Sequence, residues 1–123
     1  MAFIPEFILR SLFQHDSLKK VKGGTEMCLE NKIAFDLLVG LKPVVLDGEA
    51  FPVEKTHVDN GEQKMKASDI TAEKPFKLLK STPIRILLKG HKLTAGNHRV
   101  RIDILTKAAG EIKFEVVEAA HGT

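Results

Sequence analysis

The C-terminal third of the chain alternates apolar and polar residues as half-buried β-strands do. Val100, Ile102 and Ile104 share one parity with His98, whereas the charged residues between them take the other parity. Residues two apart lie on the same face of a strand, so this pattern predicts a strand with one buried and one solvated face. Residues 111–116 repeat the alternation and predict a second strand of the same kind.

Two glycine-bearing breaks separate the apolar segments in this region. The break at residues 107–110 is short enough for an antiparallel hairpin, and the break at residues 90–97 predicts a longer loop. Together with the apolar segment that begins at Ile84, the pattern predicts a three-stranded antiparallel sheet with one apolar face. A second layer from the upstream chain must cover that face.

Turn signals punctuate the upstream chain at short intervals. Gly23-Gly24 predicts a turn, and Asp47-Gly48 and Asn60-Gly61 are strong signals for hairpins. Residues 33–41 predict the most apolar strand, with its odd-numbered side chains on one face and a bulge near Gly40. We therefore predict an all-β fold, a single-domain antiparallel β-sandwich of immunoglobulin-like or jelly-roll type, with about eight or nine short strands.

The N-terminal segment, residues 1–13, is predicted to be an apolar arm and fits both a helix and a strand. Pro5 is compatible with extended chain and with the start of a helix. The arm carries more apolar side chains than a terminal segment can leave in water, so we expect it to pair into the sheet or to dock on another chain. Phe3, Ile4 and Phe7 are the predicted contacts with a partner or an adjacent copy.

Composition narrows the classes of function. A length of 123 residues predicts one domain, residues 1–123. The 19 basic residues are scattered among 16 acidic ones, which argues against a nucleic-acid-binding face despite the net charge of +3. The seven Phe, with no Trp or Tyr, are expected in the core rather than on a sugar-binding platform. A membrane-spanning run and a secretory signal are both missing from the pattern, so a cytoplasmic location is expected.

Few residues are candidates for a catalytic or metal-binding site. The five histidines do not fall at metal-ligand spacings, although His91 and His98 flank the glycine-bearing loop and could meet in space. These two are weak candidates for a site, against the alternative that each is a polar histidine at a strand end. Cys28 is the single cysteine, which excludes an internal disulfide and favours an inert structural thiol. Ser17 and His15 would point to opposite faces of a strand, so they do not predict a nucleophile with its base. No catalytic residue, metal or cofactor is therefore predicted in this chain.

Several motifs occur in an order that resembles a known family. An apolar opening, a glycine turn, an Asp-Gly hairpin and a histidine-bearing strand start follow one another as Phe7-Ile8-Leu9-Arg10, Gly23-Gly24, Val45-Leu46-Asp47-Gly48-Glu49 and Leu93-Thr94-Ala95-Gly96-Asn97-His98. This layout is similar to that of the small β-subunit of bacterial C-glycoside deglycosidases, and the similarity extends over nearly the whole chain.

The resemblance implies a non-catalytic role within a complex. In that family a sugar-isomerase-like (β/α)8 subunit carries a divalent, manganese-type metal and the acid–base residues, and the small subunit binds it in a hetero-oligomer. The substrate is a plant C-glycoside of flavonoid type in its 3-oxo form. The keto group acidifies the neighbouring C–H, and the resulting enolate expels the aglycone carbon. The chain is thus expected to be the accessory subunit of a carbon–carbon lyase, inactive alone and without a cofactor of its own.

Two other interpretations stay open from the sequence. The chain could be a stand-alone ligand- or carbohydrate-binding β-sandwich module with no enzymatic partner. A weaker hypothesis is a small enzyme with a site formed by His91 and His98.

Overall fold

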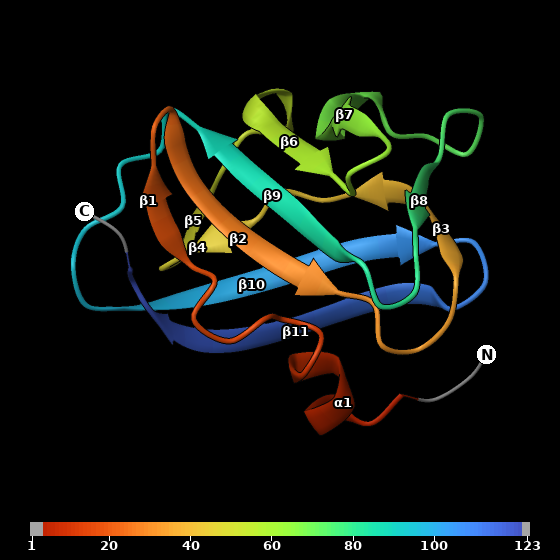
Figure 1. The fold of residues 1–123 in the computed structure, drawn as a ribbon, viewed down its shortest axis with the longest axis horizontal. Helices are drawn as coiled ribbons and strands as arrows, with labels where there is room; N and C mark the ends of the chain where they lie inside the picture. Colours follow the sequence, from red (N-terminus) through yellow and green to blue (C-terminus); the bar gives the residue numbers. More distant parts are fainter. Residues whose placement is uncertain (1–3, 122–123) are drawn as a thin grey trace.

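Two antiparallel β-sheets pack face to face and form the body of the protein (Figure 1). The structure is a computed structural model, and it describes residues 4–121. The strands of the five-stranded sheet are, in order, β1 (Lys19–Val21), β2 (Gly24–Glu30), β9 (Pro83–Lys89), β6 (Thr56–Asp59) and β7 (Lys64–Lys66). The predicted all-β sandwich is confirmed, with 11 strands in the described part of the chain, somewhat more than expected.

The second sheet has six strands and is built around β10 (Asn97–Thr106). β11 (Gly110–Ala119) pairs with one edge of β10 along its whole length. The other edge pairs with β3 and β4, which β8 and β5 extend; their bounds are β3 (Asp36–Leu41), β4 (Val45–Leu46), β5 (Glu49–Ala50) and β8 (Phe76–Leu78).

Helices are short throughout the described residues. They are α1 (Glu6–Arg10) and the two 3-10 helices η1 (Val53–Lys55) and η2 (Ala67–Asp69). Within residues 4–121, none of these helices has the length and apolar character needed to cross a membrane.

The core lies between the two sheets and follows the alternation of the strands. Val100 and Ile102 of β10 are fully buried, as are Met27 of β2 and Leu88 of β9. Removing one such aliphatic side chain from water stabilises the fold by about 1.5–3 kcal/mol. The alternation predicted for the two C-terminal strands is confirmed, because buried and exposed positions alternate along most of β10 and along the first half of β11.

The predicted three-stranded sheet is wrong, because β9 lies in the opposite sheet from β10 and β11 (Figure 1). The loop at residues 90–96 carries the chain from one sheet to the other. At about 3.3 Å per residue, a loop of this length reaches well beyond the roughly 10 Å that separates packed sheets. Alternation identifies the buried face of a strand, but it does not say which strand lies next to it.

The buried face predicted for residues 33–41 is also wrong. The strand begins only at Asp36, and Leu38, which is 2% exposed, faces the core. Ile33 and Phe35 are 39% and 54% exposed and lie in the loop that precedes the strand. The even-numbered position is therefore the inward one at the start of this strand.

The predicted bulge near Gly40 is confirmed and explains this reversal. In the register of β3 against β10, Leu41 lies opposite Ile104 and Leu38 lies opposite Thr106. Two residues of β3 thus oppose one residue of β10 between these pairs, which is the geometry of a β-bulge. The extra residue turns the strand, so Leu38 and Leu41 both pack toward the core although their numbers differ in parity.

Two predicted turns are confirmed, and each depends on positive φ angles. Asp47 and Gly48 have φ of 53° and 86° in the two-residue turn between β4 and β5, as a type I′ turn requires. Gly24, with φ of 155°, follows the turn between β1 and β2. A Cβ at Gly24 would collide with the backbone carbonyl oxygen of Leu88 in β9, so glycine lets these two strands approach.

The N-terminal segment forms a helix and then enters the core. α1 begins after Pro5 and lies beside β11 (Figure 1). Leu12 and Phe13 are buried, and Phe13 forms an antiparallel bridge with Leu29 of β2. The helical alternative for this segment is thus the one that the structure adopts.

The three predicted partner contacts differ in their surroundings. Phe7 on α1 is 74% exposed. Ile4 is partly buried and packs against the core. Phe3 lies outside the described residues. Contact with a partner stays a prediction for these residues.

Candidate functional site

His98 is the most tightly held of the candidate site residues. It lies near the start of β10 and is 6% exposed. Its Nδ1 lies 2.6 Å from Oδ2 of Asp47, and its Nε2 lies 2.7 Å from the carbonyl oxygen of Thr94. Both ring nitrogens donate only when the imidazole is protonated. The hydrogen bond to Asp47 raises the pKa of His98, against the opposing effect of burial.

Asp47 is fixed in turn by the strand that it faces. Its Oδ1 accepts a hydrogen bond of 2.8 Å from the backbone N–H of Arg99. This bond, followed by the one from His98, lowers the pKa of Asp47. Asp47 and His98 therefore form an ion pair that clamps the β4–β5 turn to β10, and both ring nitrogens of His98 are occupied. Sequence reasoning selected His98 and placed Asp47 at a hairpin tip, but it did not connect them.

His91 is held separately from His98. Its Nδ1 lies 2.7 Å from Oγ1 of Thr25, which is fully buried. Its ring meets that of Phe51 edge-on, with 5.7 Å between the ring centroids. Burial lowers the pKa of His91, and the charge of His98 lowers it further. The charge of His98 thus affects the pKa of His91, but the two predicted histidines are hydrogen-bonded to different partners.

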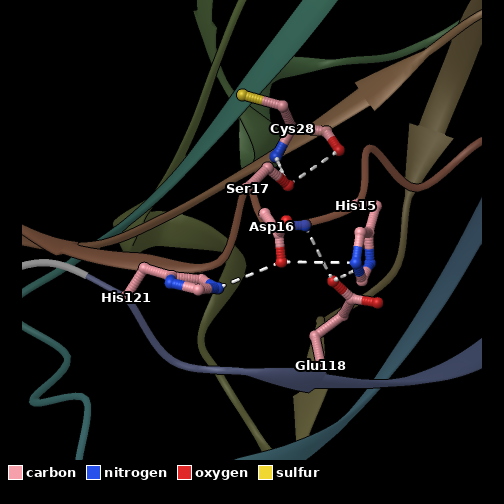
Figure 2. Close-up of polar contacts among 6 residues, drawn as sticks. All are labelled: His15, Asp16, Ser17, Cys28, Glu118 and His121. Carbon is pink, nitrogen blue, oxygen red and sulfur yellow. Dashed lines mark hydrogen bonds and ion pairs between the residues drawn. The ribbon is translucent and has the colours of Figure 1, made fainter.

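A second group of polar side chains lies where the chain enters β1. Figure 2 shows the Asp16 carboxylate between two imidazoles: its Oδ1 is 3.1 Å from Nε2 of His121 and 3.3 Å from Nε2 of His15. Nδ1 of His15 is also 3.5 Å from Oε1 of Glu118 in β11, and the backbone N–H of Asp16 donates to the same oxygen. The group was missed from the sequence because its members come from both ends of the chain.

This group ties the C-terminal end of the described chain to the first strand. The backbone N–H of His121 donates to the carbonyl oxygen of Leu18, and its own carbonyl accepts from the N–H of Lys20. The side chains of His15 and Asp16 are 82% and 62% exposed, so water screens their ion pairs. Acid–base catalysis is favoured where water is excluded, and this group is open to water.

Ser17 and Cys28 are joined to each other through backbone groups (Figure 2). The Ser17 hydroxyl accepts a hydrogen bond of 3.0 Å from the Cys28 N–H and donates one of 3.4 Å to the Cys28 carbonyl. Burial, and then the charge of Glu26, raise the pKa of the Cys28 thiol, which favours its unreactive protonated form. Within residues 4–121, no three His, Cys, Asp or Glu side chains are grouped so that they could hold a metal ion.

An apolar pocket of about 250 Å³ opens between the two sheets at one end of the sandwich. Its inner walls are buried aliphatic and aromatic side chains of both sheets, among them Leu29, Leu78, Ile84, Ile104 and Phe114. Ile33 and Phe35 also line it, from the loop between β2 and β3. The sequence signal for this pocket was the pair of large apolar residues Ile33 and Phe35. The alternation pattern assigned both of them to the strand predicted for residues 33–41.

A shallower and more polar hollow lies between α1 and β11. Phe7 and Arg10 of α1 line it together with Val117 and Glu118 of β11. Phe7 and Val117 are 74% and 60% exposed. Large apolar side chains next to charged ones, at a concave place, are typical of surfaces that contact another protein. We call this hollow the α1–β11 surface.

Comparison with known protein families decides what the chain is related to. A model of the hydroxymethylglutaryl-CoA reductase N-terminal domain matches residues 8–121. The chain belongs to this family. The reductase N-terminal domain family is named for an enzyme, so the chain is associated with an enzyme family. No curated protein matches the chain.

The resemblance to the small subunit of C-glycoside deglycosidases is wrong, because the reductase-domain match accounts for nearly the whole chain. The motifs behind the resemblance are a glycine turn, an Asp-Gly hairpin and a loop before a strand. Any antiparallel sandwich needs such turns between its strands, so their order reflects the architecture and not a shared activity.

The functional predictions that depended on the resemblance are corrected with it. A domain of the reductase family does not indicate a lyase acting on 3-oxo-C-glycosides, nor a sugar-isomerase-like (β/α)8 partner in a hetero-oligomer. The family also overturns the alternative of a stand-alone carbohydrate- or ligand-binding module. The manganese-type metal was expected in that partner and not in this chain.

Proposed function

We propose that this chain is a non-catalytic domain of an enzyme of the hydroxymethylglutaryl-CoA reductase kind, inactive alone, and that it packs against the rest of that enzyme. The observation that carries the proposal is how its polar side chains are bonded. His98 is bonded to Asp47 and Thr94, and the hydroxyl of Ser17 is bonded to the backbone of Cys28. An active site needs such groups within reach of a substrate, and here they hold strands and loops together instead.

The α1–β11 surface is the proposed contact with the rest of the enzyme. Phe7 is the largest apolar side chain exposed there, and covering it would remove it from water with a gain of about 1.5–3 kcal/mol. Arg10 is exposed and forms an ion pair with Glu6 one helical turn earlier, which provides a charged rim. Apolar centres with charged rims are the usual arrangement in contacts that domains form with each other.

The proposal is tested with the whole 123-residue chain. The purified chain is incubated with hydroxymethylglutaryl-CoA and a nicotinamide hydride donor, and oxidation of the donor is followed by absorbance. We expect no turnover above the buffer rate from the chain alone. The rest of the reductase from the same organism, prepared separately, is expected to co-elute with the chain in size-exclusion chromatography. Turnover by the isolated chain, or two components that never co-elute, would overturn the proposal.

A further inference from the structure

The apolar pocket between the sheets opens at one end of the sandwich and is lined mostly by apolar side chains. Its volume is about 250 Å³. An engineered cavity of about 150 Å³ lined by similar side chains stays dry and binds benzene. A void that water does not fill leaves its lining without dispersion contacts on one side, so an apolar occupant would restore them.

The two uncharged polar side chains in the pocket wall, Asn31 and Thr106, are bonded to the protein. Nδ2 of Asn31 donates to the carbonyl oxygens of Ala34 and Leu78, and its Oδ1 accepts from the N–H of Ile33. The hydroxyl of Thr106 donates to the carbonyl oxygen of Gly110. These bonds use the hydrogen-bonding groups that a sugar or another polar ligand would need.

Asp36 is bonded in the same way. Its Oδ1 accepts from the N–H groups of Leu37 and Ala108, and its Oδ2 accepts from the N–H of Ala109. The bonds from Ala108 and Ala109 join the start of β3 to the β10–β11 turn at the pocket wall. Burial would raise the pKa of Asp36, but the hydrogen bonds outweigh it and the pKa is lowered, so the carboxylate is charged near neutral pH.

The charge at the pocket further limits the class of ligand that can bind there. The two ionisable residues that line it, Glu30 and Asp36, are both acidic. An anionic group brought to this pocket would lose hydration and meet charges of its own sign. A fatty acid is therefore a poor ligand, whereas a neutral molecule of the same length meets no such penalty.

We propose that this pocket is a binding site for an uncharged apolar molecule or tail of roughly ten heavy atoms, a size scaled from benzene in its 150 Å³ cavity. Ile33 and Phe35, which are exposed at the pocket, would be covered by the bound molecule. Glu30 is the one lining residue that this pocket shares with the α1–β11 surface, and the filling variants lie outside that surface, so the site is tested separately from the proposed function.

The test uses the ¹⁵N-labelled full chain and two probes of equal chain length, octan-1-ol and octanoate, at pH 7. We expect octan-1-ol to shift the amide signals of Ala34, Ala108 and Ala109. These shifts should reach a plateau as the concentration of octan-1-ol is raised. We expect octanoate to bind at least about tenfold more weakly, because its carboxylate meets the acidic rim. Glu30→Gln is expected to narrow the difference between the two probes.

Filling the pocket provides the matched control. Ala109 lines the pocket and is partly buried, so Ala109→Leu is expected to abolish saturable octan-1-ol binding. Ala34→Leu, in the exposed loop at the pocket, is a second filling variant. Ala50→Leu adds the same atoms to an exposed position of β5 and is expected to leave binding unchanged. Equal binding of the two probes, unaltered binding by both filling variants, or signal shifts that map elsewhere would overturn the proposal.

Discussion

Nδ1 of His98 lies 2.6 Å from Oδ2 of Asp47, and this contact joins the start of β10 to the tip of the β4–β5 hairpin. Nε2 of the same ring lies 2.7 Å from the carbonyl oxygen of Thr94. Because a neutral imidazole has only one N–H, the full set of bonds exists only in the imidazolium form. The clamp therefore links the stability of the fold to pH.

Substitution His98→Gln is expected to lower the free energy of unfolding by about 1–3 kcal/mol, because one amide group cannot reach both partners. The folded-state pKa of His98 is raised, so its stabilisation is full below about pH 6.5 and is lost as the pH rises through the raised value. The pKa of Asp47 is lowered, so its contribution is present above about pH 3.8 and is lost as the pH falls through the lowered value.

Urea unfolding of the wild type and of His98→Gln across the pH range provides the measurement. The difference between the two proteins is expected to be largest between about pH 4 and 6.5 and to shrink as the pH is raised beyond that range. His57→Gln is the control, because His57 is only partly buried and lies on β6 of the other sheet, away from the clamp. A difference that stays constant up to pH 9 would contradict the ion-pair clamp.

Gly24→Ala is expected to destabilise the protein by about 3 kcal/mol or more, because the new methyl group meets the carbonyl oxygen of Leu88 and the backbone is strained at positive φ. Gly23→Ala is the matched control. Gly23 also has positive φ, of 97°, but nothing lies within 4 Å of a Cβ there, so its cost should be about 1–2 kcal/mol. Chemical unfolding at one pH compares the two, and equal losses would refute the close approach of β2 and β9.

Asp36→Ala is expected to cost about 1.5–3 kcal/mol, because the N–H groups of Ala108 and Ala109 lose a charged acceptor. Amide hydrogen exchange at these two residues should accelerate, because the β10–β11 turn is then held less firmly. The pKa of Asp36 is lowered, so the wild type should lose this contribution only as the pH falls below about 3.8. Asp69→Ala removes an exposed carboxylate in η2 and should change neither quantity.

Phe7→Asp is expected to leave the unfolding free energy within about 0.5 kcal/mol of the wild type, because Phe7 is mostly exposed. It should weaken binding to the rest of the enzyme at least about tenfold, since a charge would be buried in the contact. Leu105→Asp places the same charge at another exposed apolar residue, which does not line the α1–β11 surface. Isothermal titration calorimetry distinguishes them, and equal losses of affinity would place the contact elsewhere.

Much of the fold could be predicted from local pattern. Alternation identified the inward side chains of β10, such as Val100 and Ile102, because the two faces of a strand differ in solvent access. Asp47-Gly48 identified a hairpin, because few residue pairs adopt the positive φ angles of that turn. The sheet to which β9 belongs could not be predicted, since a loop that passes to the opposite sheet and one that turns back into the same sheet look alike in sequence.

Less of the candidate site could be predicted, because its contacts join distant parts of the chain. Asp47 and His98 are 51 residues apart, and Asp36 and Ala109 are 73 residues apart. The apolar pocket is lined by Ile33 and Phe35, which alternation assigned to a strand but which lie in the loop before β3. The family to which the chain belongs could not be predicted from the turns, because sandwiches of different function need the same turns.

The central strands of both sheets come from the last third of the chain, and this sets a constraint on biosynthesis. In the described residues, β9 joins the β1–β2 hairpin to the β6–β7 hairpin, and β10 joins the strand pairs β3–β8 and β4–β5. A ribosome releases those earlier strands before their joining strands exist, so the edges of the earlier strands stay unpaired until β9 and β10 have been translated. Nascent chains of this kind expose unpaired strand edges that are prone to aggregation, and they fold slowly because their strand pairing is non-local. Premature termination before residue 97 would leave one layer of the sandwich without its central strand.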